Sequence, residues 1–113
     1  QRSRRGLQAL GGREMSKKKR RRFSQGSFGE SVEALMAETG TTYRALAQKT
    51  HLSAGYLNHI VHGNRPVPDN AVIASIAKAL GVDTEFFRDY RIRKVTDRLQ
   101  GDGALTDRLY RRL

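Results

Sequence analysis

The sequence predicts an all-α protein: a bundle of five short helices with a C-terminal helical extension and a disordered basic N-terminal arm. Two observations lead to this fold class. Apolar residues in the middle of the chain recur at the i, i+3, i+4 spacing of amphipathic helices and nowhere alternate as in a strand. Capping residues and glycines divide this pattern into short pieces. At 113 residues the chain has room for one domain. We expect the arm over residues 1–26, the bundle over 27–90 and the extension over 91–113.

The N-terminal arm concentrates the charge of the chain, whose formal net value is +11. Residues 1–22 hold ten Lys or Arg against the single acid Glu14, whereas residues 23–113 hold twelve against ten acids. Because the arm has almost no large apolar residues, we expect it to be disordered in solution. A charge block of this density indicates a polyanion as partner. Met15, followed by a lysine run, has the form of a translation start, which would make residues 1–14 upstream sequence.

The first two helices of the bundle follow from their caps and apolar stripes. The first is expected from about Glu30 to Thr39, and Gly40 follows in the position where glycine ends helices. Thr42 is the expected N-cap of the second helix, which Thr50 closes. The inward-facing residues of these two helices are Val32, Leu35, Met36, Leu46 and Ala47.

A short turn, His51-Leu52, leads to the third helix, which Ser53 caps and which covers about residues 54–62. Gly63 ends it. Proline in the loop 64–68 keeps that segment from being helical. Asp69 and Asp83 are the expected caps of the fourth and fifth helices, and Gly81 separates the two. The inward-facing residues are Leu57, Ile60 and Val61 in the third helix, Val72, Ile73, Ile76, Ala77 and Leu80 in the fourth, and Phe86 and Phe87 in the fifth.

Two short capped helices joined by a three-residue turn, over residues 42–63, form the arrangement of a DNA-binding helix-turn-helix. The major groove is about 12 Å wide and admits one helix. The first helix must cross the second closely to hold it at the surface, so a small residue is needed at the crossing, and Ala47 supplies it. The third helix of the bundle is therefore the predicted recognition helix.

Residues 42–53 (TYRALAQKTHLS), 56–60 (YLNHI) and 63–66 (GNRP) resemble the Cro/repressor (XRE) type of helix-turn-helix. Residues 73–82 and Phe86-Phe87 resemble that family's fourth and fifth helices. The likeness is particularly close to actinobacterial regulators with a Ser-Ala-Gly-Tyr-Leu-Asn recognition helix. This resemblance implies a lambda-repressor-like fold and transcriptional regulation in bacteria or phage.

Four residues depart from the family's pattern. His51 stands at a turn position that usually holds glycine and often needs a positive φ. Tyr43 replaces a glutamine that contacts the DNA backbone, although its hydroxyl can still donate to a phosphate. Ala54 and Gly55 stand where many relatives place Gln, Arg or Lys, so Ala54 can offer only apolar contact with a thymine methyl and Gly55 only close approach.

The polar side chains on the exposed face of the third helix are the candidates for DNA contact. Asn58 and His59 are expected to bond base edges, and His62 to contact phosphate or the groove edge. Arg65 is expected to contact phosphate, while Tyr56 lies either over the DNA backbone or in the core. The full set of expected DNA-binding residues is Tyr43, Arg44, Lys49, Ser53, Ala54, Gly55, Tyr56, Asn58, His59, His62, Asn64 and Arg65.

Other classes of function find little support. The chain has no cysteine, so disulfides and thiolate metal sites are excluded. His51, His59 and His62 are the histidines, and without a nearby carboxylate they do not predict a metal site. No nucleophile–base pair or paired acids suggest catalysis, and neither a cofactor nor a small-molecule ligand is indicated. No apolar run is long enough for a membrane span. We therefore expect a non-enzyme in the cytoplasm, associated with the nucleoid.

The predicted function is a sequence-specific transcriptional regulator that binds double-stranded DNA. Two alternatives stay open: a basic architectural or RNA-associated protein with little sequence preference, and a protein-interaction module. The extension 91–113 carries a second helical stripe around a break at 101–103, and a short helix with an exposed stripe needs a surface to bury against. That surface is either a second copy, which gives a homodimer, or the bundle of the same chain. The stripe comprises Ile92, Val95, Leu99, Leu105, Leu109 and Leu113.

Overall fold

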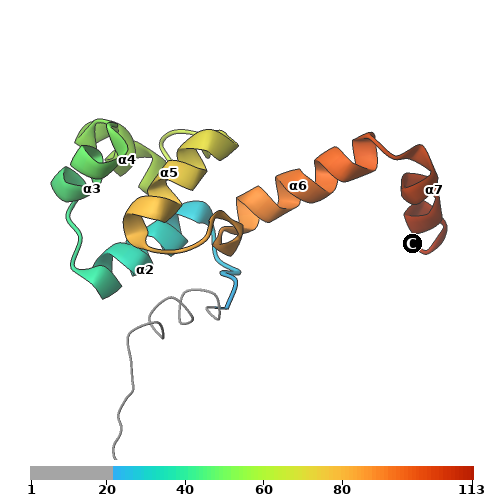
Figure 1. Ribbon diagram of the computed structural model, residues 1–113, viewed down its shortest axis with the longest axis horizontal. Coiled ribbons are helices and arrows are strands. Elements are labelled where there is room, and N and C mark those ends of the chain that lie inside the picture. The colour runs from blue at the N-terminus through green and yellow to red at the C-terminus, as the bar shows by residue number, and fades with distance from the viewer. Residues whose placement is uncertain (1–21) are drawn as a thin grey trace, which may run out of the picture.

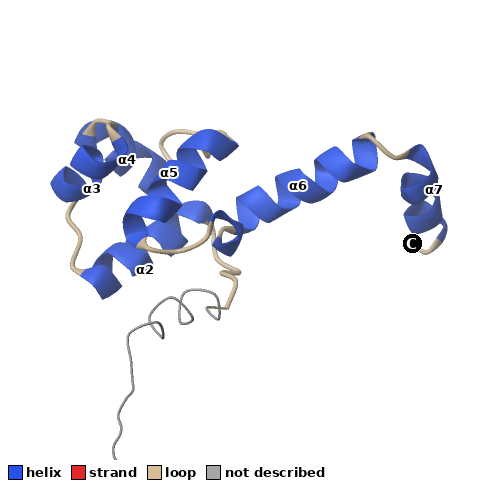
Figure 2. Cartoon of the chain, in the orientation of Figure 1, coloured by secondary structure: helices blue, strands red, loops and turns tan. Residues whose placement is uncertain are grey.

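The computed structural model describes residues 22–113, and every regular element in this range is helical (Figure 2). The predicted all-α fold class is confirmed. The predicted arm lies outside the described residues, except for its last few. The elements, in chain order, are α2 (Phe28–Thr39), α3 (Tyr43–Thr50), α4 (Ala54–Val61), α5 (Asn70–Leu80), the 3-10 turn η2 (Thr84–Phe86), α6 (Arg88–Gln100) and α7 (Gly103–Arg111).

The helix starts are set by side-chain caps. Thr42, Ser53 and Asp69 each accept a hydrogen bond from the backbone N–H three residues ahead, so the predicted N-caps of α3, α4 and α5 are confirmed. Helix α2 begins two residues earlier than predicted, because Ser27 and Glu30 form a reciprocal capping box.

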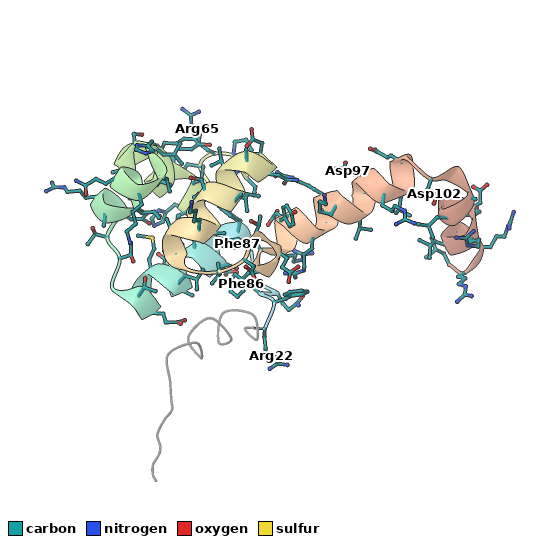
Figure 3. All side chains as sticks on the ribbon, in the orientation of Figure 1. Arg22, Arg65, Phe86, Phe87, Asp97 and Asp102 are labelled. Carbon is teal, nitrogen blue, oxygen red and sulfur yellow. The ribbon has the colours of Figure 1, made fainter. Side chains whose placement is uncertain are left out.

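The core lies among α2, α3, α4 and α5 and is closed by Phe87, whose side chain is fully buried. The Phe87 ring contacts Phe28 at a centroid distance of 5.0 Å. It contacts Phe86, which is labelled beside it in Figure 3, at 5.3 Å. The inward-facing positions of α2 to α5 are buried as the helical spacing predicts, with Val72 and Ala47 half-buried at the edge. The buried apolar residues are Phe28, Val32, Leu35, Met36, Leu46, Leu57, Ile60, Val61, Ile73, Ile76, Ala77, Leu80, Val82 and Phe87.

The predicted fifth helix is wrong in form. Asp83 makes no side-chain cap bond, and the segment after it is the short 3-10 turn η2, followed by Phe87 in an extended conformation. The reason is the pair of adjacent phenylalanines. On one continuous α-helix their side chains would point about 100° apart. The extended backbone at Phe87 lets its ring enter the core while Phe86 lies at the edge. The next helix, α6, starts at Arg88 and runs through the predicted boundary at residue 90 without a break.

Helix α6 leaves the bundle, and α7 lies at its far end, turned back toward it (Figure 1). Asp102 caps α7 by accepting from the Leu105 N–H at 3.0 Å, and the Thr106 hydroxyl donates to the Leu99 carbonyl of α6 at 2.6 Å. None of the residues of α6 or α7 is fully buried. The apolar side chains of the extension are therefore not buried against Phe86, Phe87 and the fourth helix, although Arg91 and Arg93 at the start of α6 bond to this part of the bundle.

Residues 23–26, which the sequence predicts as part of the arm, contact the bundle and the start of α6. The Ser24 N–H donates to the Phe86 carbonyl at 3.0 Å. Arg91 of α6 donates to the carbonyls of Ser24 and Phe86, both at 2.8 Å, and its guanidinium stands 4.6 Å from the centre of the Phe23 ring. These contacts order residues 23–26 against the base of α6, because the guanidinium satisfies backbone carbonyls on both segments at once.

Candidate nucleic-acid interface

The turn between α3 and α4 sets the angle at which α4 is displayed. His51 ends α3 with φ 61°, in the left-handed region, which confirms the positive φ expected at this position. A histidine there carries a strain that glycine would not. Behind it, the buried Thr50 hydroxyl donates to the Leu46 carbonyl at 2.8 Å, so the end of α3 is satisfied internally. The chain then turns directly into α4.

Helix α4 is held from beneath by its apolar face and by a close approach of α2. Leu57 and Ile60 are buried. Gly29 of α2 lies so close to α4 that a Cβ atom there would stand 2.0 Å from the Val61 carbonyl oxygen. Only glycine permits this contact. Gly29 is not among the residues predicted from the sequence, and the signal that could have found it is a glycine inside an amphipathic helix pattern.

The opposite face of α4 is open. Ala54, Gly55, Asn58 and His59 are all exposed, and a Cβ atom added at Gly55 would meet no protein atom within 4 Å. These residues are the ones predicted for the recognition face, and the structure brings them together on one side of one helix. A helix presented in this way can enter a major groove.

The stretch of chain that contains this face carries charge of one sign. From Thr39 to Pro68 the chain contains no Asp or Glu, although acids are spread over the rest of residues 23–113. The same stretch contains Arg44, Lys49 and Arg65, all exposed. Arg65 projects from the loop after α4, at the edge of the molecule (Figure 3). A stretch of chain without acids and with three exposed cations favours a polyanion over a protein or small-molecule partner of mixed charge.

The sequence of residues 27–89 matches the family described as "Helix-turn-helix domain". The chain belongs to the helix-turn-helix domain family. The matched segment runs from the N-cap of α2 to the start of α6 and so covers the whole bundle. It includes α3, the turn and α4, where the sequence predicted the motif.

Two curated bacterial proteins are similar to this helix-turn-helix domain. HTH-type transcriptional regulator RamB of Mycobacterium tuberculosis is 42% identical over 65 residues, which are 58% of this chain and 14% of RamB. HTH-type transcriptional repressor RghR of Bacillus subtilis is 39% identical over 59 residues, which are 52% of this chain and 44% of RghR. The chain thus spans less than half the length of either relative. No solved structure matches the sequence.

Two tyrosines flank the recognition face of the helix-turn-helix domain. Tyr43 and Tyr56 are half-buried and pack against the core, so each ring is partly structural. Burial raises the pKa of the Tyr43 phenol, and nearby Glu33 raises it further. Tyr43 therefore keeps its proton at and above neutral pH and remains a hydrogen-bond donor, as a contact to a phosphate oxygen requires.

Two further side chains of the expected set already have internal partners. Ser53 uses its hydroxyl oxygen to accept from the Tyr56 N–H at 3.0 Å. The Nδ1 atom of His62 lies 2.9 Å from the Asn58 carbonyl oxygen, and because a carbonyl only accepts, Nδ1 carries the proton. In the neutral ring Nε2 is then an acceptor. It can accept from an amino group on a base edge, but it cannot donate to a phosphate oxygen. Asn64 is exposed in the loop that follows.

The described residues offer little to other chemistries. Within 22–113 no three His, Cys, Asp or Glu side chains gather closely enough to hold a metal ion. No helix in that range has the length and apolar character needed to cross a membrane.

Proposed function

We propose that this protein is a sequence-specific DNA-binding transcriptional regulator that inserts α4 into the major groove. The observation that carries the proposal is the open face of α4, displayed beside an acid-free stretch of chain that holds three exposed cations. The names of RamB and RghR, a transcriptional regulator and a transcriptional repressor, support the same function. Such a protein acts on the nucleoid, so we place it in the cytoplasm.

The residues divide by role. Asn58 and His59 read base edges, because they are the longest polar side chains on the open face of α4. Ala54 and Gly55 allow the start of α4 to sit deep in the groove. His62, Ser53 and Tyr56 border this face. The cations and donors around it fix the domain on the DNA backbone without reading sequence, and they are Tyr43, Arg44, Lys49, Asn64 and Arg65.

Selection of bound sites from random duplex DNA tests this function. We expect one preferred site with wild-type protein, and Asn58→Ala and His59→Ala to cost roughly 1–3 kcal/mol of discrimination at particular bases. Gln100→Ala is the matched control, because it removes an exposed amide from α6, away from α4. If Asn58→Ala selects the same site as wild type with the same strength, the reading face is misplaced. No enriched site, together with affinity that collapses as salt rises, would support the architectural alternative instead.

We further propose that the regulator binds as a homodimer through residues 91–113. One helix-turn-helix contacts few base pairs, and two-fold related copies reach two half-sites about one helical turn apart. Support comes from the exposed apolar side chains of the extension. Ile92 and Val95 on α6 are 48% and 57% exposed, and Leu109 on α7 is 44% exposed. Scattered apolar residues need no explanation, but a stripe along two helices that stand clear of the bundle does.

A further inference from the structure

The loop between α4 and α5 carries Arg65 but does little to hold itself in place. Pro66 and Pro68 have no N–H to donate. Within residues 22–113 no backbone–backbone hydrogen bond reaches positions 65–68, although Val67 packs against the core. Val67 and the buried Pro68 hold the end of the loop by packing, whereas its carbonyl groups need hydrogen-bond partners from elsewhere in the protein.

Arg93 of α6 satisfies them. Its Nη1 atom donates to the Pro68 carbonyl at 2.6 Å and to the Asn70 side-chain oxygen at 3.1 Å, and its Nη2 atom donates to the Val67 carbonyl at 3.2 Å. The side chain is half-buried and crosses an open cleft between the loop and α6. One planar guanidinium thus ties three acceptors, two of them backbone groups, to a helix that begins twenty residues later in the chain.

We propose that Arg93 is a positioning residue for DNA recognition: it holds the loop so that Asn64 and Arg65 are presented to the DNA backbone without touching DNA itself. This inference rests on the proposed function. Arg93 is suited to this indirect role because its fork is already engaged by the loop, whereas a residue that contacts phosphate would be free and exposed, as Arg65 is.

The same bond network connects the DNA-contacting loop to the helix of the proposed dimer. On α6, Arg93 stands about 100° around the axis from Ile92, so a second copy seated on the Ile92 stripe leaves the bonds of Arg93 intact. It would, however, fix the rotation of α6, and therefore the position from which Arg93 holds the loop. A dimer contact on α6 would then change the position of Arg65 through the Arg93 side chain.

The test compares Arg93→Ala with Lys94→Ala on the full chain, each titrated against the duplex that wild type selects. Lys94 is the matched control: it is the exposed neighbour on α6, its loss removes the same charge, and its ammonium group lies 5.9 Å from the centre of the Tyr90 ring rather than on the loop. We expect Arg93→Ala to lose about tenfold in affinity, which corresponds to about 1.4 kcal/mol, and Lys94→Ala to stay close to wild type. Arg93→Lys keeps the charge without the fork and should lose most of the same affinity.

A double-mutant cycle with Arg65→Ala separates positioning from a general loss of stability. If Arg93 acts through Arg65, removing it in the Arg65→Ala background should cost much less than tenfold. Amide hydrogen exchange gives a readout without DNA: in Arg93→Ala and Arg93→Lys it should accelerate at the hydrogen-bonded amides that flank the loop, Gly63, Asn64 and Val72, and stay unchanged in α2.

The outcomes distinguish this inference from the proposed function. If wild type selects no site, the proposed function fails. If wild type selects a site and Arg93→Ala binds it like Lys94→Ala, or if the effects of Arg93 and Arg65 simply add, the positioning role is overturned. Should Arg93→Ala unfold, Arg93→Lys carries the same comparison.

Discussion

Gly55 is the residue on α4 that packing does not explain. An added methyl group would meet no protein atom within 4 Å, and glycine inside a helix costs roughly 0.5–1 kcal/mol relative to alanine. We expect Gly55→Ala to raise the free energy of unfolding by about that amount, in urea melts. The same variant should bind the selected duplex more weakly, since the methyl group occupies the space that the groove would approach. A stabilised protein with unchanged affinity would show that DNA does not come close to Gly55.

Single residues were predictable where their cause is local. Thr42, Ser53 and Asp69 cap their helices through hydrogen bonds to the N–H three residues ahead. Both partners of each bond therefore lie within four consecutive residues of the sequence. The positive φ of His51 was expected from the resemblance to a family that usually has glycine at this turn position. The bond from His62 to Asn58 was not predictable, because it depends on one side-chain rotamer. Arg93 was missed for another reason: its acceptors lie more than twenty residues away in the sequence.

At the scale of elements, the position of α4 depends on its contact with α2. A Cβ atom at Gly29 would stand 2.0 Å from the Val61 carbonyl oxygen. Because this oxygen belongs to the backbone, it cannot move away as the end of a flexible side chain could. We expect Gly29→Ala to lower the free energy of unfolding by about 1–3 kcal/mol or more, as overpacking does. Thermal and urea melts measure it. Gly55→Ala is the matched control, because the same chemical change on the neighbouring helix should have the opposite sign. Equal effects at the two glycines would mean that α2 and α4 do not meet so closely.

The elements themselves were predictable to the extent that burial repeats along them. Val32, Leu35 and Met36 occupy one face of α2 as their spacing indicates, and α3 to α5 follow the same rule. The η2 turn was not predictable from periodicity. The extended backbone of Phe87 is determined by packing in the core and not by the residues next to it in the sequence. Nor does the stripe on α6 say in which direction the helix leaves the bundle. That direction comes from contacts between distant segments, such as Arg91 with Ser24.

At the scale of the molecule, the place of Arg22 decides how far the basic residues before it must reach to meet DNA bound at α4. Arg22 and Arg65 lie on opposite sides of the bundle in Figure 3. The 21 residues that precede Arg22, at about 3.3–3.6 Å each when extended, are long enough to pass around the domain to the DNA. We expect deletion of residues 1–21 to leave thermal stability and site preference intact. The slope of log K against log salt should become shallower by about 0.9 for each phosphate that the arm no longer neutralises.

Deletion of residues 1–14 is the control for the arm, because it removes four arginines but keeps the tract from Lys17 to Arg22. It should change the slope much less than the longer deletion. An unchanged slope in both variants would mean that the arm does not touch the duplex in the complex.

The proposed dimer has an unusual electrostatic signature, because residues 88–113 contain eight Lys or Arg against four Asp. Two copies joined through α6 and α7 bring like charges together, while the apolar stripe supplies the attraction. Screening weakens the repulsion but leaves the apolar attraction. We therefore expect self-association to strengthen as salt rises from about 0.05 to 0.5 M, opposite to the trend for DNA binding, which salt weakens. Light scattering over this range measures it.

The variant that tests the interface is Leu109→Asp, with Ala104→Asp as its matched control. Both add one negative charge to α7 at an exposed position, but Leu109 belongs to the apolar stripe, whereas Ala104 lies about 140° around the helix axis from it. Leu109→Asp should give a monomer that retains the melting temperature of the bundle and binds a single half-site as weakly as the wild-type monomer does. Ala104→Asp should remain dimeric, because the added carboxylate lies off the stripe and lowers the net positive charge of each copy. If the wild-type chain is monomeric at every salt concentration, the proposed dimer is wrong. The apolar stripe would then need another partner to cover it.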